Sequence, residues 1–264
     1  MPQFAANLSM MFTEEPFLRR FGAAAEAGFR AVEYLFPYEH TSDEISSALQ
    51  QHGLTQALFN APPGRWEDGE RGIASLPDRD AEFDQGLETA LEYARALNCR
   101  QVHVMAGIAD SADPAARQRY VERIRRAAQT AQAHGVRILI EPINPVDMPG
   151  YFLSSVGMGR QILDEIDHSN VGLQLDLYHA QITDGDLSRL IASTAPVTSH
   201  IQIAGVPDRH EPDLGEVNYA YLFERIDSAG YTGWIGCEYR PAAATAEGLD
   251  WFRPYRAQQG RSGQ

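Results

Sequence analysis

The sequence predicts an α/β fold, a single (β/α)8 TIM barrel in which eight parallel strands lie inside a ring of helices. Strand-like and helix-like segments alternate along the 264 residues without a low-complexity linker, and this length suits one such barrel. The first strand-like segment is followed by NLSMMFTEEP, which lacks the GxGxxG turn of a doubly wound nucleotide-binding sheet. The barrel is expected to cover residues 1–258, with a flexible polar tail at 259–264.

Eight short segments are the expected strands. Several are apolar on both faces, as is usual for parallel strands covered on both sides. In chain order they span residues 3–10, 31–36, 55–60, 101–107, 137–144, 171–179, 197–205 and 234–239. Eight is the number of strands that closes a barrel of this type.

Amphipathic segments separate the earlier strands. The clearest spans residues 80–97, where apolar side chains recur every three or four positions. Other helices are expected within 14–28, 41–53 and 114–135. Their end signals are Gly28, Gly53 and Gly135 after the helices, with Thr41 or Ser42 and Pro114 at the starts. Each of these helices then leads into a strand.

Composition indicates a soluble protein without a membrane partner. Hydrophobic residues make up 44% and charged residues 22%, and no apolar run approaches the roughly 20 residues of a membrane helix. The first residues, MPQFAANLSMMF, do not resemble a secretory signal. Cys99 and Cys237 have no CxxC partner, which favours a reducing, cytoplasmic location. Assembly into a homo-oligomer is left open.

The charge balance excludes nucleic acid as an expected partner. The formal net charge is −14, from 22 Lys and Arg against 36 Asp and Glu, and such a surface repels a phosphate backbone. The densest basic segment, RQRYVERIRRAA from Arg117, also contains Glu122 and has helical spacing. We interpret it as a solvated helix face.

Polar residues stand at the ends of the four last strands. They are Glu141 in LIEPIN, Asp176 in LQLDLYH, Gln202 in HIQIAG and Glu238 in GCEYRP. Chemistry in a barrel is expected where strands end, and a buried carboxylate needs either a charged partner or a cation. A single carboxylate in such a place is more often a salt-bridge partner. Four oxygen donors on consecutive strands predict a divalent metal site for Mg²⁺ or Mn²⁺.

Further polar residues near these strand ends are candidates for substrate binding. His179 follows Asp176 by three positions and is either a loop histidine bonded to backbone or a hydrogen-bond donor to a substrate oxygen. His103 is expected to support the core or the site, and His200 to share the face of Gln202. Two long polar loops, after the third and seventh strands, are either connectors or lids. An acidic protein needs local arginines to hold an anion, and the candidates on these loops are Arg65, Arg71 and Arg209, beside Glu70.

Several long motifs identify a family resemblance that runs from Phe4 to about Tyr255. They are FAANLSMMF, GFRAVEYLFPY, GERGIASLP, LIEPIN, LQLDLYH, HIQIA, DRHEP, GEVNYAYLF and GYTGWIGCEYRP. The sequence resembles the hydroxypyruvate isomerase family of xylose-isomerase-like TIM barrels, and within it the 2-oxo-tetronate isomerases. IEPINPVDMPGYFL is more similar to the hydroxypyruvate branch, whereas ALFNAPPG and QIAGVPDRHEPD are more similar to the 2-oxo-tetronate branch.

The resemblance implies metal ligands at Glu141, Asp176, Gln202 and Glu238, and an acid/base pair at Glu141 and Glu238. It also implies the isomerisation of a small anionic 2-oxo-3-hydroxy acid, either 2-oxo-tetronate or hydroxypyruvate, without a nucleotide cofactor. One alternative is a ketose 3-epimerase acting on a neutral sugar, for which histidine is expected where Gln202 stands. Another is a non-catalytic sugar-binding barrel, which would have lost a strand-end carboxylate.

Overall fold

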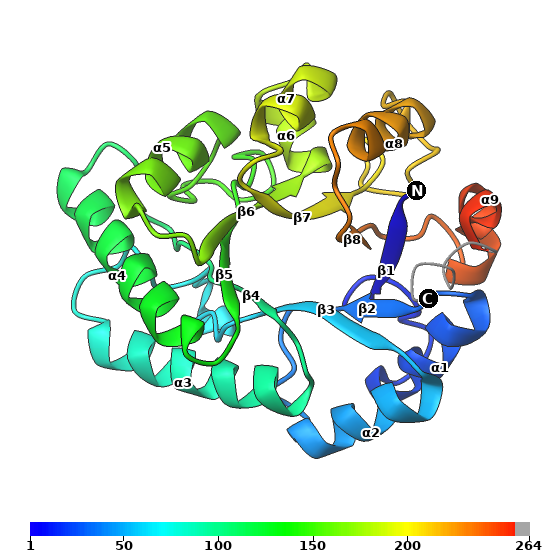
Figure 1. Cartoon of the computed structure of the whole chain (residues 1–264), viewed down its shortest axis with the longest axis horizontal. Coiled ribbons are helices and arrows are strands. Elements are labelled where there is room, and N and C mark those ends of the chain that lie inside the picture. Colours follow the sequence, from blue (N-terminus) through cyan, green and yellow to red (C-terminus); the bar gives the residue numbers. More distant parts are fainter. Residues whose placement is uncertain (257–264) are drawn as a thin grey trace.

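The computed structural model describes residues 1–256 and contains a closed barrel of eight parallel strands, with helices around it (Figure 1). The strands are β1 (Gln3–Asn7), β2 (Ala31–Glu33), β3 (Thr55–Asn60), β4 (Gln101–His103), β5 (Arg137–Ile140), β6 (Val171–Asp176), β7 (Thr198–Ile203) and β8 (Trp234–Cys237). Pairing of β1 with β8, from Gln3 opposite Trp234 onward, closes the ring. The predicted (β/α)8 fold is therefore confirmed, and the predicted tail at 259–264 lies outside the described residues.

Helices follow most of the strands. They are α1 (Phe17–Ala27), α2 (Ser42–His52), α3 (Asp80–Ala96), α4 (Pro114–Gln132), α5 (Val156–Ile166), α6 (Leu177–Thr183), α7 (Leu187–Thr194), α8 (Tyr219–Ser228) and α9 (Arg253–Arg256), with short 3₁₀ turns at Trp66–Asp68 and Thr245–Phe252. Two of the residues predicted to end or begin helices, Gly28 and Thr41, do so in the structure. Gly28 closes α1 with a φ of 105°, and Thr41 begins α2 with a capping box that includes Glu44.

Several strands are shorter than predicted, and the sixth shows why. The segment 171–179 was expected to be a strand throughout, but β6 ends at Asp176 and α6 begins at the next residue. The carboxylate of Asp176 accepts a hydrogen bond of 2.7 Å from the backbone N–H of Tyr178, as an N-cap does. The apolar residues after Asp176 continue as helix because this cap satisfies the first free N–H groups.

The hydrophobic core fills the layer between the strands and the surrounding helices. Phe4 of β1, Phe59 of β3 and Ile140 of β5 are buried in it. The interior of the barrel also holds buried polar side chains, among them Glu33 and His200. Among residues 1–256, no helix is long and apolar enough to cross a membrane. The site described next lies where this polar interior meets the carboxyl-terminal strand ends.

Candidate active site

The four strand-end residues lie at the carboxyl-terminal end of the barrel. Glu141 directly follows β5, Asp176 ends β6, Gln202 lies near the end of β7 and Glu238 directly follows β8. In the register of β6 and β7, Asp176 stands opposite Gln202. All four side chains are buried. The parallel arrangement brings them together because every strand of the barrel ends on the same side.

The carboxylates form a donor set suited to a cation. Carboxylate oxygens of Glu141 and Asp176 lie within 4.8 Å of each other and of a ring nitrogen of His179. Burial, followed by the charges of Glu238 and Asp176, raises the pKa of Glu141 well above its ordinary value. Burial also raises the pKa of Glu238 to about 8, although Arg209 opposes this shift. Among the described residues, Glu141 Oε1 has no hydrogen-bond partner, so it is available as a ligand.

Arg209 supplies a positive charge to this set. Its Nη2 lies 3.1 Å from Glu238 Oε2, 3.5 Å from Asp176 Oδ2 and 3.4 Å from His179 Nε2. Its backbone has a φ of 58°, a conformation uncommon outside glycine, and hydrogen bonds join it to Gly205 on one side and Arg240 on the other. The guanidinium is buried among groups that would otherwise repel one another, so it partly neutralises the carboxylates.

His179 is held in one tautomer by Asn144. The amide oxygen of Asn144 accepts hydrogen bonds from the backbone N–H groups of Val146 and Asp147, which turns its amide nitrogen toward His179. This nitrogen lies 2.6 Å from His179 Nδ1, so Nδ1 accepts and the proton resides on Nε2. Burial lowers the pKa of His179 well below its ordinary value, with Arg209 adding to the effect. The ring is a neutral donor through Nε2.

Gln202 is fixed by a buried network centred on Glu33 of β2. The Gln202 amide nitrogen donates to Glu33 Oε1 over 2.8 Å, while its oxygen accepts from Gln174 over 2.6 Å. His200 Nε2 lies 2.6 Å from the other oxygen of Glu33. A β-carbon at Gly236 of β8 would collide with the Glu33 carboxylate, so glycine there makes room for it. Glu33 thereby determines which end of the Gln202 amide is the oxygen.

His103 of β4 supports Glu141 from beneath. Its Nδ1 lies 3.2 Å from Asn60 Oδ1 and 3.5 Å from Glu141 Oε2. Burial lowers the pKa of His103 to about 3, and His200 adds to this effect. The ring is therefore neutral, in keeping with the supporting position predicted for it.

A cavity of about 400 Å³ opens above the carboxylates. Its lining includes Glu141, His179 and Glu238, together with Arg71 from the loop after β3. The guanidinium of Arg71 stacks on the ring of Trp66, 3.9 Å from its centroid, and donates to the backbone oxygens of residues 66 and 70. Within the described chain Arg71 has no carboxylate partner, which leaves its charge available to a ligand.

The two remaining substrate-binding candidates lie elsewhere. Arg65 and Glu70 form an ion pair of 3.0 Å with each other, and Glu70 also pairs with Arg79 at 2.7 Å. Neither Arg65 nor Glu70 is among the described residues that line the cavity. The structure therefore places them in a network that holds the loop, beside Arg71 but outside the cavity.

Sequence reasoning missed three residues of this region. Glu33 carried a signal, because a carboxylate stands inside the apolar segment AVEYLF. Asn144 lies in EPINP and Arg240 in EYRP, each just beyond a strand end, and Arg240 lines the cavity. The sequence shows that these residues stand in or just after strands. It does not show which residues they contact, because those partners belong to other segments of the chain.

Comparison with known proteins identifies the family. The xylose isomerase-like TIM barrel family matches residues 21–255. The chain is 54% identical to the 2-oxo-tetronate isomerase of Cupriavidus necator, over 97% of this chain and 99% of that protein. It is 41% identical to the hydroxypyruvate isomerase of Escherichia coli, over 97% and 100%. The chain belongs to the hydroxypyruvate isomerase family of xylose isomerase-like TIM barrels.

Solved structures share this fold. A crystal structure described as an AP endonuclease, family 2, from Brucella melitensis has a TM-score of 0.96 and 53% identity, over 97% of this chain and 100% of that one. The 3-keto-D-glucoside 4-epimerase YcjR of E. coli has a TM-score of 0.80 at 21% identity, over 96% and 99%, and this likeness shows the fold alone. The predicted family resemblance is confirmed.

Proposed function

We propose that the protein is an isomerase that moves a carbonyl group between neighbouring carbons of a small 2-oxo-3-hydroxy acid. The substrate is 2-oxo-tetronate, hydroxypyruvate or both. The single observation that carries this proposal is the pair of buried glutamates, Glu141 and Glu238, that face one cavity beside Arg209. Relatives that are 54% and 41% identical over almost the whole chain carry the corresponding isomerase names, which supports the same reaction here.

The reaction needs one proton moved from C3 of the substrate to C2, and the proton of the C3 hydroxyl moved to the oxygen on C2. Hydroxypyruvate then becomes 2-hydroxy-3-oxopropanoate, and 2-oxo-tetronate becomes 3-oxo-tetronate, with no net oxidation. Glu238 is suited to remove the first proton in its ionised fraction, which the Arg209 contact of 3.1 Å increases against the effect of burial. Glu141, whose pKa burial raises well above its ordinary value, is suited to carry a proton and return it. Positioned proton transfer of this kind contributes about 10²–10⁴ in rate.

A divalent cation fits the same residues. Three buried carboxyls with raised pKa and an unpartnered Glu141 Oε1 are the donors that Mg²⁺ or Mn²⁺ prefers. Gln202 can join them because its amide oxygen keeps a second lone pair beside the Gln174 contact. A cation held there supplies stabilisation of the negative charge that develops on the substrate oxygens.

The neighbouring side chains orient the substrate. Asn144 keeps the His179 proton on Nε2, which suits His179 to donate to a substrate oxygen rather than to bind a metal through that nitrogen. Arg71 lines the cavity without a carboxylate partner in the described chain and can hold the substrate carboxylate. Arg240, in the same lining, is a second cation for this purpose. A net charge of −14 argues against a nucleic-acid substrate.

The substrate test compares hydroxypyruvate and 2-oxo-tetronate side by side. We expect the purified protein to isomerise at least one of them, and kcat/KM for each ranks the two. A neutral ketose such as D-fructose is the third arm, because an epimerase would act on it. Epimerisation of fructose without turnover of either acid would replace the proposal with the epimerase alternative.

Substitution of the glutamates tests the acid/base assignment. Glu141→Gln and Glu238→Gln should each abolish turnover while the circular dichroism spectrum stays that of the wild type. Glu39→Gln, at an exposed position, is the control and should be fully active. Near-normal activity in either site variant would overturn the assignment.

Chelation tests the metal separately. Exhaustive treatment with EDTA should lower both activity and the melting temperature, and added Mg²⁺ or Mn²⁺ should restore them. If neither quantity changed, the acid/base pair would stand and the cation would be withdrawn.

A further inference from the structure

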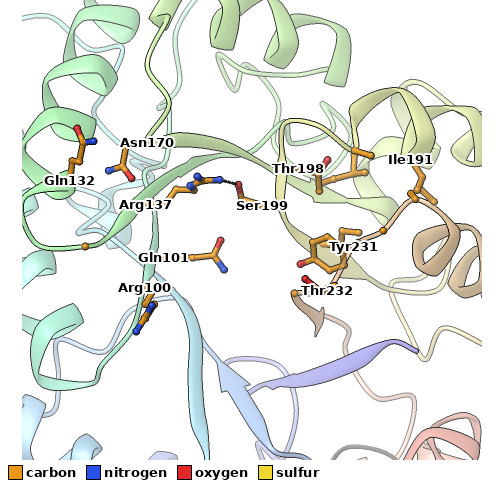
Figure 2. Close-up of a pocket in the computed structure, with 17 residues that line it drawn as sticks. Arg100, Gln101, Gln132, Arg137, Asn170, Ile191, Thr198, Ser199, Tyr231 and Thr232 are labelled. Atoms are coloured by element: carbon orange, nitrogen blue, oxygen red, sulfur yellow. Dashed lines mark hydrogen bonds between the residues drawn. The ribbon is translucent and has the colours of Figure 1, made fainter. Parts of the chain in front are cut away.

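A second cavity, of about 660 Å³, lies at the opposite end of the barrel. Figure 2 shows it among the amino-terminal ends of the strands, where β4, β5 and β7 begin with Gln101, Arg137 and Thr198. The segment from Ala229 to Gly233, just before β8, forms another wall. The proposed chemistry at the carboxyl-terminal mouth uses none of these residues. The volume is in the range of small-molecule sites.

The charge of this cavity differs from that of the rest of the molecule. None of the described residues that line it is Asp or Glu, although the chain carries 36 acidic residues. Arg100 and Arg137 both line it, and they begin neighbouring strands, with the Arg137 N–H donating to the Arg100 carbonyl. Neither guanidinium has a carboxylate partner within the described chain. Two arginines in one lining without an acid favour an anion there.

Arg137 is exposed to solvent, and a hydrogen bond holds its side chain against the lining of the cavity. Its Nη1 donates to Ser199 Oγ over 2.9 Å, and Figure 2 shows this bond joining the side chains of Arg137 and Ser199, from β5 and β7. A β-carbon at Gly172 of β6 would collide with Ser199 Oγ and contact the Arg137 side chain. Glycine between these strands thus makes room for the pair. The remaining N–H groups of Arg137 are available to a ligand.

Neutral polar groups surround this cation. In Figure 2, Gln101 points toward the middle of the cavity, with the hydroxyl groups of Tyr231 and Thr232 on the opposite wall and Arg100 at the edge. The Tyr231 hydroxyl donates to the Trp234 carbonyl, so toward a ligand it accepts. Amide and hydroxyl groups can both donate hydrogen bonds to an alcohol and accept them from it. An inorganic anion only accepts hydrogen bonds, so this lining suits a ligand with hydroxyl groups better.

We propose that this amino-terminal cavity is a second, non-catalytic binding site for a small carboxylate that carries several hydroxyl groups. Arg137 holds the carboxylate, with Arg100 adding positive potential from the edge. Gln101, Thr232 and Tyr231 bind the hydroxyl groups. The site stands on its own lining and does not depend on the reaction proposed for the mouth.

The test uses threonate, a four-carbon acid with three hydroxyl groups and no 2-oxo group to isomerise. Binding to the full chain is followed by NMR titration for the wild type, Arg137→Gln and Arg30→Gln. Arg30 is a matched control because it is exposed and precedes β2 at the same end, but does not line the cavity. We expect Arg137→Gln to weaken one binding component by about tenfold or more, as a lost charged hydrogen bond does. Arg30→Gln should leave it unchanged.

Inorganic phosphate in parallel titrations separates recognition of hydroxyl groups from recognition of charge. Thr232→Val should weaken threonate binding and leave phosphate binding unchanged, with kcat equal to that of the wild type. Equal threonate binding by the wild type and Arg137→Gln, or no binding by either, would overturn the site. Phosphate that binds as tightly as threonate and with the same dependence on Arg137 would overturn the hydroxycarboxylate class.

Discussion

Two glutamates in this molecule each contact an arginine, yet their pKa values move in opposite directions. Glu238, at the mouth, lies 3.1 Å from Arg209, and burial raises its pKa to about 8. Glu70, in the loop after β3, lies 2.7 Å from Arg79, and hydrogen bonds from Arg79 lower its pKa to about 2. The geometries are similar, so the number of charges and the access to water make the difference.

The comparison separates a reactive cluster from a structural one. At the mouth, one buried guanidinium faces Glu141, Asp176 and Glu238, so acidic charge is in excess. In the loop, two arginines face Glu70, and water reaches the group. Excess buried acid destabilises a fold unless a cation or a proton compensates, and it is tolerated where chemistry needs it. A balanced ion pair on a loop needs no such explanation.

Removal of the two arginines should give the largest contrast. Arg209→Met takes away the guanidinium beside Glu238 and Asp176, and we expect kcat/KM to fall by on the order of 10²-fold or more. Arg79→Met removes the equivalent contact in the loop and should leave kcat/KM close to that of the wild type. Steady-state kinetics on the better substrate measure both. Equal losses in the two variants would mean that the loop pair also belongs to the active site.

Glu33→Gln should have the next largest effect. A glutamine there can present either an oxygen or an amide nitrogen to Gln202, so the amide orientation of Gln202 is no longer enforced. Loss of such a supporting partner commonly costs about 10- to 100-fold in metal affinity or activity. Calorimetric titration of the chelated protein with Mn²⁺ measures the affinity directly. Unchanged Mn²⁺ affinity would show that Gln202 is not positioned by Glu33.

The sequence predicted most of the fold because every strand carries its own local pattern. The caps at Thr41 and Gly28 could be located because they follow from single residue types. The end of β6 could not, since LDLYH fits a strand by composition and becomes helix only when Asp176 caps the next turn. Local periodicity therefore predicts the number and order of the strands and helices better than the residues at which they end.

The candidate site was predictable to a lesser degree. Strand-end position alone brought Glu141 and Glu238 to one cavity, because all strands of a parallel barrel end on one side. The spacing of Arg65 and Arg71 in one loop could not show that one pairs with Glu70 while the other faces the cavity. The positions of Asn144 and Glu33 depend on contacts across strands and were not predicted.

Replacement by glutamine should change the free energy of unfolding in opposite directions at Glu238 and Glu70. The pKa of Glu238 is raised in the folded chain, so its contribution to stability falls as pH rises from about 4.5 toward about 8. Glu238→Gln should therefore stabilise the chelated protein above pH 8, by on the order of 1 kcal/mol or more, and change little near pH 4. Urea unfolding across this range measures it. A variant less stable than the wild type at pH 8 would mean that the Arg209 contact outweighs burial.

Glu70→Gln should show the smallest effect and the opposite sign. The pKa of Glu70 is lowered in the folded chain, so its stabilising contribution is complete above about pH 4.5 and is lost as pH falls toward about 2. We expect a loss of about 0.5–1 kcal/mol at pH 7, as for a partly exposed ion pair. Below pH 3 the variant and the wild type should unfold at converging urea concentrations. A constant difference from pH 7 to pH 2 would assign the effect to packing of the loop rather than to the charge of Glu70.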